Sequence, residues 1–214
     1  MNSSVRFSDQ PLVDAASSEA SSPAVRDRGA LGLRGLSSFP FISDGGRQWA
    51  SHWWGLPRAG LVPLRSVFDP REVPELLPHM MICDLSEPGV VRIRLMGTGM
   101  VASFGFDPTG RDYLDLVAPE RREAALAGFQ VPAQHPCGMR VLGENRYANG
   151  KKMAVEAVSF PFRRDDGAGM QMVFVGSNID RDLGPWPDLD YTETFHVFER
   201  QFLDIGAGVP DAAA

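Results

Sequence analysis

Alternation of apolar and polar residues marks a hairpin in the first half of the chain. Residues 80–85 form an apolar run of strand length, and a turn follows at Glu87-Pro88-Gly89. In residues 91–95, three apolar side chains alternate with Arg92 and Arg94. A period of two with charged residues in between is typical of an antiparallel strand that buries one face. We therefore predict an antiparallel hairpin over 80–96.

Three further strands are predicted in the second half of the chain. Residues 139–148 and 151–162 are joined by Asn149-Gly150, a dipeptide that favours a two-residue hairpin turn. A polar turn at 164–167 leads into an apolar stretch at 170–179. Connections this short join antiparallel neighbours. Together with the first hairpin, the pattern predicts a five-stranded antiparallel sheet.

Short helices are predicted before and between these strands. Residues 97–106 carry small and apolar residues at helical spacing, and 119–129 begin with a proline and keep apolar residues on one side. Residues 48–55 place Trp49 and Trp53 one turn apart. This tryptophan face either closes a core as a lid or forms an exposed patch for a partner. The predicted fold class is α+β, with the short helices on one face of the sheet.

A C-terminal apolar stripe predicts one more helix. Within residues 184–206, apolar residues recur in steps of four, three, four and three, which is the spacing of one helical face. Asp188 or Asp190 would cap this amphipathic helix, and Gly206 would end it. The helix either packs on its own domain or contacts a partner helix over two heptads. The stripe consists of Tyr191, Phe195, Phe198, Phe202 and Ile205.

Changes in composition divide the chain into four segments. Ten of the 16 serines lie in residues 1–46, which lack a sustained apolar period, so we predict a disordered Ser-rich tail there. Residues 47–183 carry the predicted sheet and form the domain. Residues 184–206 form the C-terminal helix, and residues 207–214 form a flexible tail.

Composition and charge argue against several classes of protein. The 214 residues are 43% hydrophobic and 22% charged, as expected for a globular domain. The formal net charge is −6, whereas nucleic-acid-binding surfaces need clustered cationic charge, so we expect no nucleic-acid partner. The longest stretch without charged residues, 124–139, is too short for a membrane span and contains two prolines. With two cysteines and no visible secretory signal, we expect reduced thiols and a cytoplasmic location.

The order of several short sequence motifs resembles the PAS sensor domains. The resemblance covers about residues 48–180, and within the family it is to a bacterial group of stand-alone PAS proteins with a tryptophan-rich leader. The individual motifs are weak, but their order is specific. They are WW at 53–54, LVPLRSVFDP at 61–70, LLP at 76–78, VRIRLMGTG at 91–99, GFDPTGRDYLDLV at 105–117 and PERR at 119–122.

The resemblance implies a non-enzymatic sensory module. Such a module binds a small ligand between its sheet and its short helices, contacts a partner protein, and often forms a homodimer. Because the chain carries no recognisable kinase, cyclase or DNA-binding domain, the resemblance implies a stand-alone bacterial regulator in signal transduction. The implied partner is a signalling protein such as a histidine kinase.

Sequence patterns related to dinucleotide, haem and flavin binding are incomplete in this chain. Gly97-Thr98-Gly99 with Ala102 fits a dinucleotide fingerprint, but the preceding strand has one exposed face and no parallel strand follows, so these glycines let a helix start close to the sheet. For haem, His52, His79, His135 and His196 form no spaced metal pair, and His135-Pro136-Cys137 reverses the haem-regulatory dipeptide. For flavin, the sequence lacks the motif Asn-Cys-Arg-Phe-Leu-Gln that carries the reactive cysteine of flavin photosensors, and Cys83 is predicted to be a buried thiol. The cofactor stays unknown, with haem and flavin disfavoured.

Methionines point to an adaptable apolar pocket. Eight of the nine methionines lie inside the proposed domain, and thioether side chains fill irregular space and re-pack easily. Simple core filling is the alternative. Tyr113 and Asn178 would orient a small apolar or mixed ligand, and Arg94 would either pair with an acidic ligand or lie on a solvated face. The predicted pocket residues are Ile93, Arg94, Met100, Phe104, Phe106, Tyr113, Leu126, Met153, Phe174 and Asn178.

Two other functions compete with a ligand-binding sensor. The first is a small α+β hydratase or isomerase, which needs a buried acid or base in its pocket, with Asp112, Asp115 or His135 as candidates. The second is a purely structural interaction domain, which differs from the sensor by having no cavity. No nucleophile stands next to a visible base in the sequence.

Overall fold

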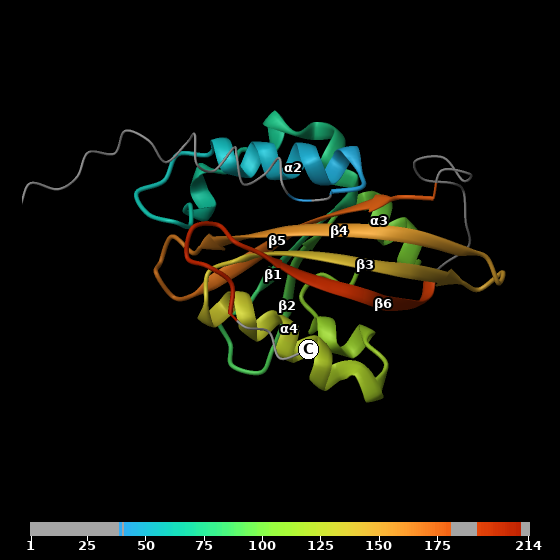
Figure 1. Ribbon diagram of the computed structural model, residues 1–214. Helices are drawn as coiled ribbons and strands as arrows, with labels where there is room; N and C mark the ends of the chain where they lie inside the picture. The colour runs from blue at the N-terminus through green and yellow to red at the C-terminus, as the bar shows by residue number, and fades with distance from the viewer. Residues whose placement is uncertain (1–38, 40, 181–191, 211–214) are drawn as a thin grey trace, which may run out of the picture.

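The computed structural model describes residues 39, 41–180 and 192–210, and its central element is one six-stranded sheet (Figure 1). The strands lie in the order β2-β1-β5-β4-β3-β6, and every neighbouring pair is antiparallel. The strands are β1 (Met80–Asp84), β2 (Arg92–Met96), β3 (Gly138–Tyr147), β4 (Lys152–Arg163), β5 (Met170–Asn178) and β6 (Thr192–Leu203). The α-helices are α2 (Asp44–Gly55), α3 (Thr98–Phe104) and α4 (Arg122–Gln134). The 3₁₀ helices are η1 (Arg65–Val67), η2 (Pro70–Glu72), η3 (Pro74–His79), η4 (Tyr113–Leu116) and η5 (Pro119–Arg121).

The five strands predicted from the sequence are present. β1 pairs with β2, and Met81 lies opposite Met96. β3 pairs with β4 around the Asn149-Gly150 turn, and β4 pairs with β5. Gly150 has a φ of 80°, the left-handed conformation that this turn requires. The predicted helices at 97–106 and 119–129 correspond to α3 and to η5 followed by α4. The α+β class is therefore confirmed.

The predicted C-terminal helix over 184–206 is wrong, because residues 192–203 form strand β6 along the edge of β3. Residues 184–191 lie outside the described part of the chain. The register between β3 and β6 shifts twice, near Gly143 and near Tyr147. Each shift moves the alternation of buried positions by one residue. The shift beside Phe198 places Phe195 and Phe202 on the same face although they are seven residues apart, which is also the spacing of a helical face. The sheet therefore has six strands rather than the predicted five.

Helices cover both faces of the sheet, which corrects the prediction that they lie on one face (Figure 1). Successive residues of β1 point to opposite sides, so Met80 packs with the tryptophans of α2 and Met81 packs with Phe129 of α4. α2 contacts β4 and β5. Trp49 and Trp53 are fully buried, and their indole N–H groups donate to backbone carbonyls of β5 and β4 at 3.1 and 3.0 Å. The tryptophan face is therefore a lid on a core rather than an exposed patch.

The predicted segment boundaries shift at the start of the domain. α2 begins at Asp44 instead of residue 48, and Ser43 caps it, so the ordered domain starts inside the predicted Ser-rich tail. Residues 1–38 and 40 of that tail and residues 211–214 of the predicted flexible tail lie outside the described residues. Within the described part of the chain, no helix combines the length and apolar character needed to cross a bilayer.

The buried carboxylate of Glu156 fixes the start of α2 on the sheet. Glu156 lies on β4 and is fully buried. Its Oε1 accepts hydrogen bonds from the backbone N–H of Ile42 at 3.0 Å and from Arg140 Nε at 2.7 Å, and its Oε2 accepts one from the backbone N–H of Ser43 at 2.8 Å. Burial would raise the pKa of Glu156, but these donors outweigh burial and lower the pKa. One carboxylate therefore joins the segment before α2 to β4 and β3.

Replacing Glu156 tests this anchor. We expect Glu156→Gln to lower the free energy of unfolding by about 3 kcal/mol at pH 7, because the amide cannot accept from all these donors and Arg140 loses its buried partner. The folded-state pKa lies below the ordinary value of 4.5, so the carboxylate stabilises the fold above that pH and loses this contribution as the pH falls further. Urea unfolding should therefore show the gap between wild type and variant shrinking below about pH 4.5. A gap that does not change between pH 7 and 3 contradicts the assignment.

Close packing at Gly97 allows α3 to start against η3. A Cβ atom at Gly97 would lie 2.1 Å from the carbonyl oxygen of Leu77. This short distance agrees with the prediction that Gly97 lets a helix start close to its neighbours. The glycines that resemble a dinucleotide fingerprint are therefore explained by packing.

Alanine at Gly97 should destabilise the domain. We expect Gly97→Ala to lower the free energy of unfolding by about 2 kcal/mol, because the backbone of η3 or α3 must shift. Gly55→Ala is the matched control, since a Cβ there meets nothing within 4 Å. Its effect should stay within about 0.5 kcal/mol. Denaturant titrations in which both variants lose the same stability would refute this explanation.

Candidate ligand-binding cavity

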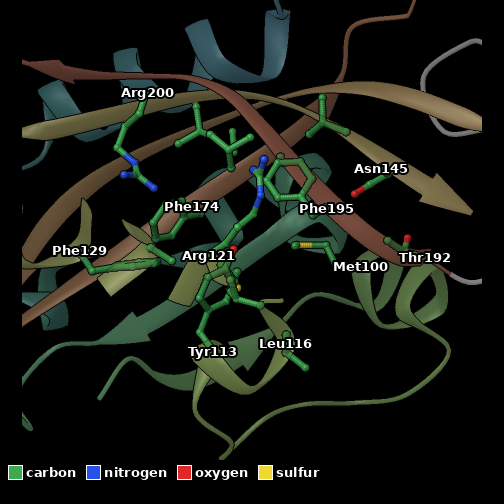
Figure 2. Close-up of a pocket in the computed structure, with 18 of the residues that line it drawn as sticks. Met100, Tyr113, Leu116, Arg121, Phe129, Asn145, Phe174, Thr192, Phe195 and Arg200 are labelled. Atoms are coloured by element: carbon green, nitrogen blue, oxygen red, sulfur yellow. The ribbon is translucent and has the colours of Figure 1, made fainter. Parts of the chain in front are cut away.

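A cavity of about 680 Å³ lies between the sheet and the helices on its second face (Figure 2). All six strands contribute to one side of it, and α3, η4, η5 and α4 supply the other. A volume of this size is typical of sites for small organic molecules. Its wall is mainly apolar, and the residues that define it best are Met81, Met96, Met100, Phe129, Met139 and Phe174.

Small side chains and an aromatic cluster shape this cavity. Ala125, Ala157 and Gly176 line it and take up little space. The ring of Phe129 on α4 meets the rings of Tyr113 and Phe174 at centroid distances of 5.3 and 5.6 Å, both close to edge-on. The cluster therefore holds α4 over the sheet, while the small residues leave the space beside it open.

Polar contacts attach β6 to the elements around the cavity. Ser103 Oγ of α3 lies 2.9 Å from Thr192 Oγ1 of β6. Arg121 Nη2 of η5 lies 3.3 Å from His196 Nε2 of β6. Ser103, Thr192 and Arg121 also line the cavity. The edge strand and the helices thus share contacts at the rim of the same space.

Arg200 brings a second guanidinium to the cavity wall, opposite Arg121 (Figure 2). Its Nη1 donates to the carbonyl oxygen of Ala124 in α4 at 3.1 Å. Gly128 makes this approach possible, because a Cβ there would lie 2.4 Å from Arg200 Cζ. Arg200 Nε is buried and has no hydrogen-bond partner among the described residues. Burial lowers the pKa of Arg200, but an arginine remains charged at pH 7.

Tyr113 is the aromatic residue of the wall with a polar end. Burial, with a smaller contribution from the thiol of Cys83, raises the pKa of its phenol from 10.0 to about 12 against the opposing charge of Arg200. The phenol is therefore neutral at physiological pH and can donate a hydrogen bond.

Comparison with family models decides the family. A model described as a PAS domain matches residues 43–177, which is more than half of the chain. The chain belongs to the PAS domain family. The matched range begins at the cap of α2 and ends in β5, so β6 lies outside it. A search of curated proteins finds no match.

Solved structures with a similar fold include PAS and light-oxygen-voltage domains. A light-oxygen-voltage domain studied with a flavin analogue is 17% identical, with a TM-score of 0.39, over 52% of this chain and 84% of that chain. The PAS domain of an HTR-like protein from Haloarcula marismortui is 19% identical, with a TM-score of 0.35, over 51% and 90%. VqmA bound to DPO is 16% identical, with a TM-score of 0.40, over 52% and 57%.

Seven of the ten predicted pocket residues pack against apolar side chains inside the PAS domain. Four of these seven line the cavity. The four on the cavity wall are Met100, Phe104, Tyr113 and Phe174. The three that pack against other apolar side chains without lining the cavity are Ile93, Leu126 and Met153.

The other three predicted pocket residues lie elsewhere on the PAS domain. Phe106 is 40% exposed. Arg94 pairs with Asp84, with 3.2 Å between Nε and Oδ2, on the exposed face of β2. Asn178 lines a separate hollow of about 550 Å³ beside the start of α2. Of the predicted polar pocket residues Arg94, Tyr113 and Asn178, Tyr113 alone lies on the wall of the larger cavity.

Sequence interpretation misses the polar wall of the PAS cavity. Arg200 and Thr192 come from β6, which the sequence pattern assigns to a helix, so their approach to the cavity could not be anticipated. Asn145 lies on β3 and Arg121 on η5, and both line the cavity beside β6. The sequence does contain one indication of a strand here, because five of the seven residues at 192–198 are threonine, phenylalanine or valine, which favour strands.

The residues proposed for an enzyme do not line the cavity. Asp112 Oδ1 accepts from the backbone N–H of Leu114 at 3.0 Å and caps η4. Asp115 is exposed, and His135 Nε2 lies 3.0 Å from the carbonyl oxygen of Gly208. Among the described residues, no group of three or more potential ligands could hold a metal ion. Asp112 and His135 therefore make their contacts outside the cavity, and Asp115 faces solvent.

Cys83 and His52, two of the candidate residues for flavin and haem chemistry, occupy packed positions. Cys83 is fully buried in β1, and burial raises the pKa of its thiol, as expected for an unreactive side chain. His52 stacks on Trp49 on the α2 side of the sheet, away from the cavity. Neither residue can contact a molecule in the cavity from its present position.

Titration of the phenol tests the environment of Tyr113. We expect the difference between the 295 nm absorbance of wild type and Tyr113→Phe to titrate near pH 12, because the phenolate is disfavoured by burial. Circular dichroism recorded at each pH shows whether the protein is still folded. A difference curve with its midpoint near pH 10 in folded protein would mean that Tyr113 is solvated.

Proposed function

We propose that this chain is a non-enzymatic PAS sensory module that binds a small, largely apolar molecule in the 680 Å³ cavity and transmits occupancy to a partner protein such as a histidine kinase. The observation that carries the proposal is the cavity itself, which lies on one face of the sheet while the other face is closely packed under α2. PAS domains generally act as sensory modules, and a cavity of this size with an apolar wall suits a small organic ligand.

The walls of the cavity supply a mechanism for transmission. A ligand between the sheet and α4 would touch β6 as well, and β6 is attached to α3 and η5 by the Ser103–Thr192 and Arg121–His196 contacts. Filling the cavity would favour one packing of these elements over another. The ligand changes that equilibrium only by binding one packing more tightly than the other. The exposed surface of β6, where Phe198 is 61% exposed, is the element through which a partner would detect the change.

Two phenylalanine substitutions on α4 separate cavity binding from surface binding. Ala125 lines the cavity, whereas Ala127 on the same helix is exposed and does not. We expect wild type and Ala127→Phe to bind the uncharged dye N-phenyl-1-naphthylamine with a rise in fluorescence. Ala125→Phe should bind it roughly tenfold more weakly or worse, because the added ring occupies the cavity.

The outcome of that experiment decides the proposal. Circular dichroism and thermal unfolding first establish that both variants are folded. Absence of dye binding to the wild type, or equal loss in the two variants, contradicts a ligand-binding cavity and favours the structural interaction domain instead.

A further inference from the structure

The cavity contains more positive than negative charge, and its cations lack carboxylate partners. Arg121, Arg200 and Glu120 are the ionised side chains that line it, so their charges sum to about +1 at pH 7. Neither arginine forms an ion pair with a described residue, whereas Arg94, Arg140 and Arg164 do. The neutral phenol of Tyr113 adds a hydrogen-bond donor.

Arg200 has donors without acceptors. Its Nη1 is occupied by the carbonyl oxygen of Ala124, and its Nε is buried with no partner among the described residues. Nη2 makes no hydrogen bond with a described residue, so it is the donor left for a carboxylate in the cavity. An ionised carboxylate on this donor would form a charge-assisted hydrogen bond with a guanidinium that has no carboxylate partner among the described residues.

We propose that the cavity binds an amphipathic monocarboxylate, with the carboxylate on Arg200 and the apolar body against Phe129, Phe174 and the methionines. This inference rests on the proposed function, because it names the class of ligand for the same cavity. The lining charge of about +1 matches one carboxylate better than a doubly charged phosphate. Arg121 supplies a second cation near the rim, and Tyr113 supplies the neutral donor.

Three eight-carbon probes that differ only in the head group test this inference. Isothermal titration calorimetry measures the binding of octanoate, 1-octanol and octylammonium to the full chain. We expect octanoate to bind at least about tenfold more tightly than 1-octanol, since a charge-assisted hydrogen bond exceeds a neutral one, and octylammonium to bind most weakly.

Variants of Arg200 assign the preference to this side chain. Arg200→Gln should reduce the affinity for octanoate to that for 1-octanol and leave 1-octanol unchanged. Arg200→Lys should keep part of the preference, because it retains the charge without the planar fork. Arg163→Gln is the matched control, since Arg163 is an exposed arginine at the end of β4 and should keep the full preference.

Stability measurements separate ligand binding from a structural role. Arg200→Gln loses the hydrogen bond to Ala124 but also removes the unpaired Nε, so its unfolding temperature should lie within about 4 °C of that of wild type. A large loss of stability in this variant overturns the inference, because it would mean that the guanidinium serves the fold. Equal affinities of wild type for octanoate and 1-octanol, or the same loss in Arg163→Gln, overturn it too. If N-phenyl-1-naphthylamine still binds in those cases, the proposed function survives and only the carboxylate class fails.

Discussion

Burial on the two faces of one antiparallel sheet is the constraint on which the rest of the structure depends. On the first face, Trp49 and Trp53 fill the space under α2, and their indole N–H groups find backbone carbonyls of the sheet. On the second face, short helices separated by turns cover the same strands, and alanines and a glycine line the space between them. The same sheet therefore has a closely packed face that stabilises the fold and an open face that can receive a ligand.

Much of the architecture could be predicted from local patterns. The alternation around Arg92 and Arg94 and the turn at Asn149-Gly150 are signals within a few residues, and the structure contains both hairpins. The spacing of the tryptophans in α2 also predicted an apolar helix face, which the structure buries. The sequence pattern did not indicate that α2 lies on the side opposite α4, because which face a helix covers depends on the path of the chain between elements.

The wrong prediction of a helix at β6 shows where local sequence patterns mislead. A register shift against β3 beside Phe198 puts Phe195 and Phe202 on one face, and their seven-residue separation is also the spacing of a helical face. The error also hid part of the site, because Thr192 and Arg200 belong to that strand. Of the predicted pocket residues on correctly predicted elements, Met100, Phe104 and Phe174 line the cavity. Ile93, Leu126 and Met153 also lie on predicted elements but pack elsewhere, because the local pattern does not show what each side chain meets. Polar residues of the wall depend on contacts between distant segments, and a single sequence does not specify those contacts.

Methyl signals of the methionines test the central claim, that the second face of this PAS domain encloses a ligand-binding cavity, most directly. Met81, Met96, Met100 and Met139 line the cavity, whereas Met80 and Met170 belong to the packing on the α2 face. In a titration of methyl-labelled protein with N-phenyl-1-naphthylamine, followed by NMR, we expect saturable shifts for the four cavity methionines and little change for the other two. Shifts that are absent, or that are largest for Met80 and Met170, would contradict it.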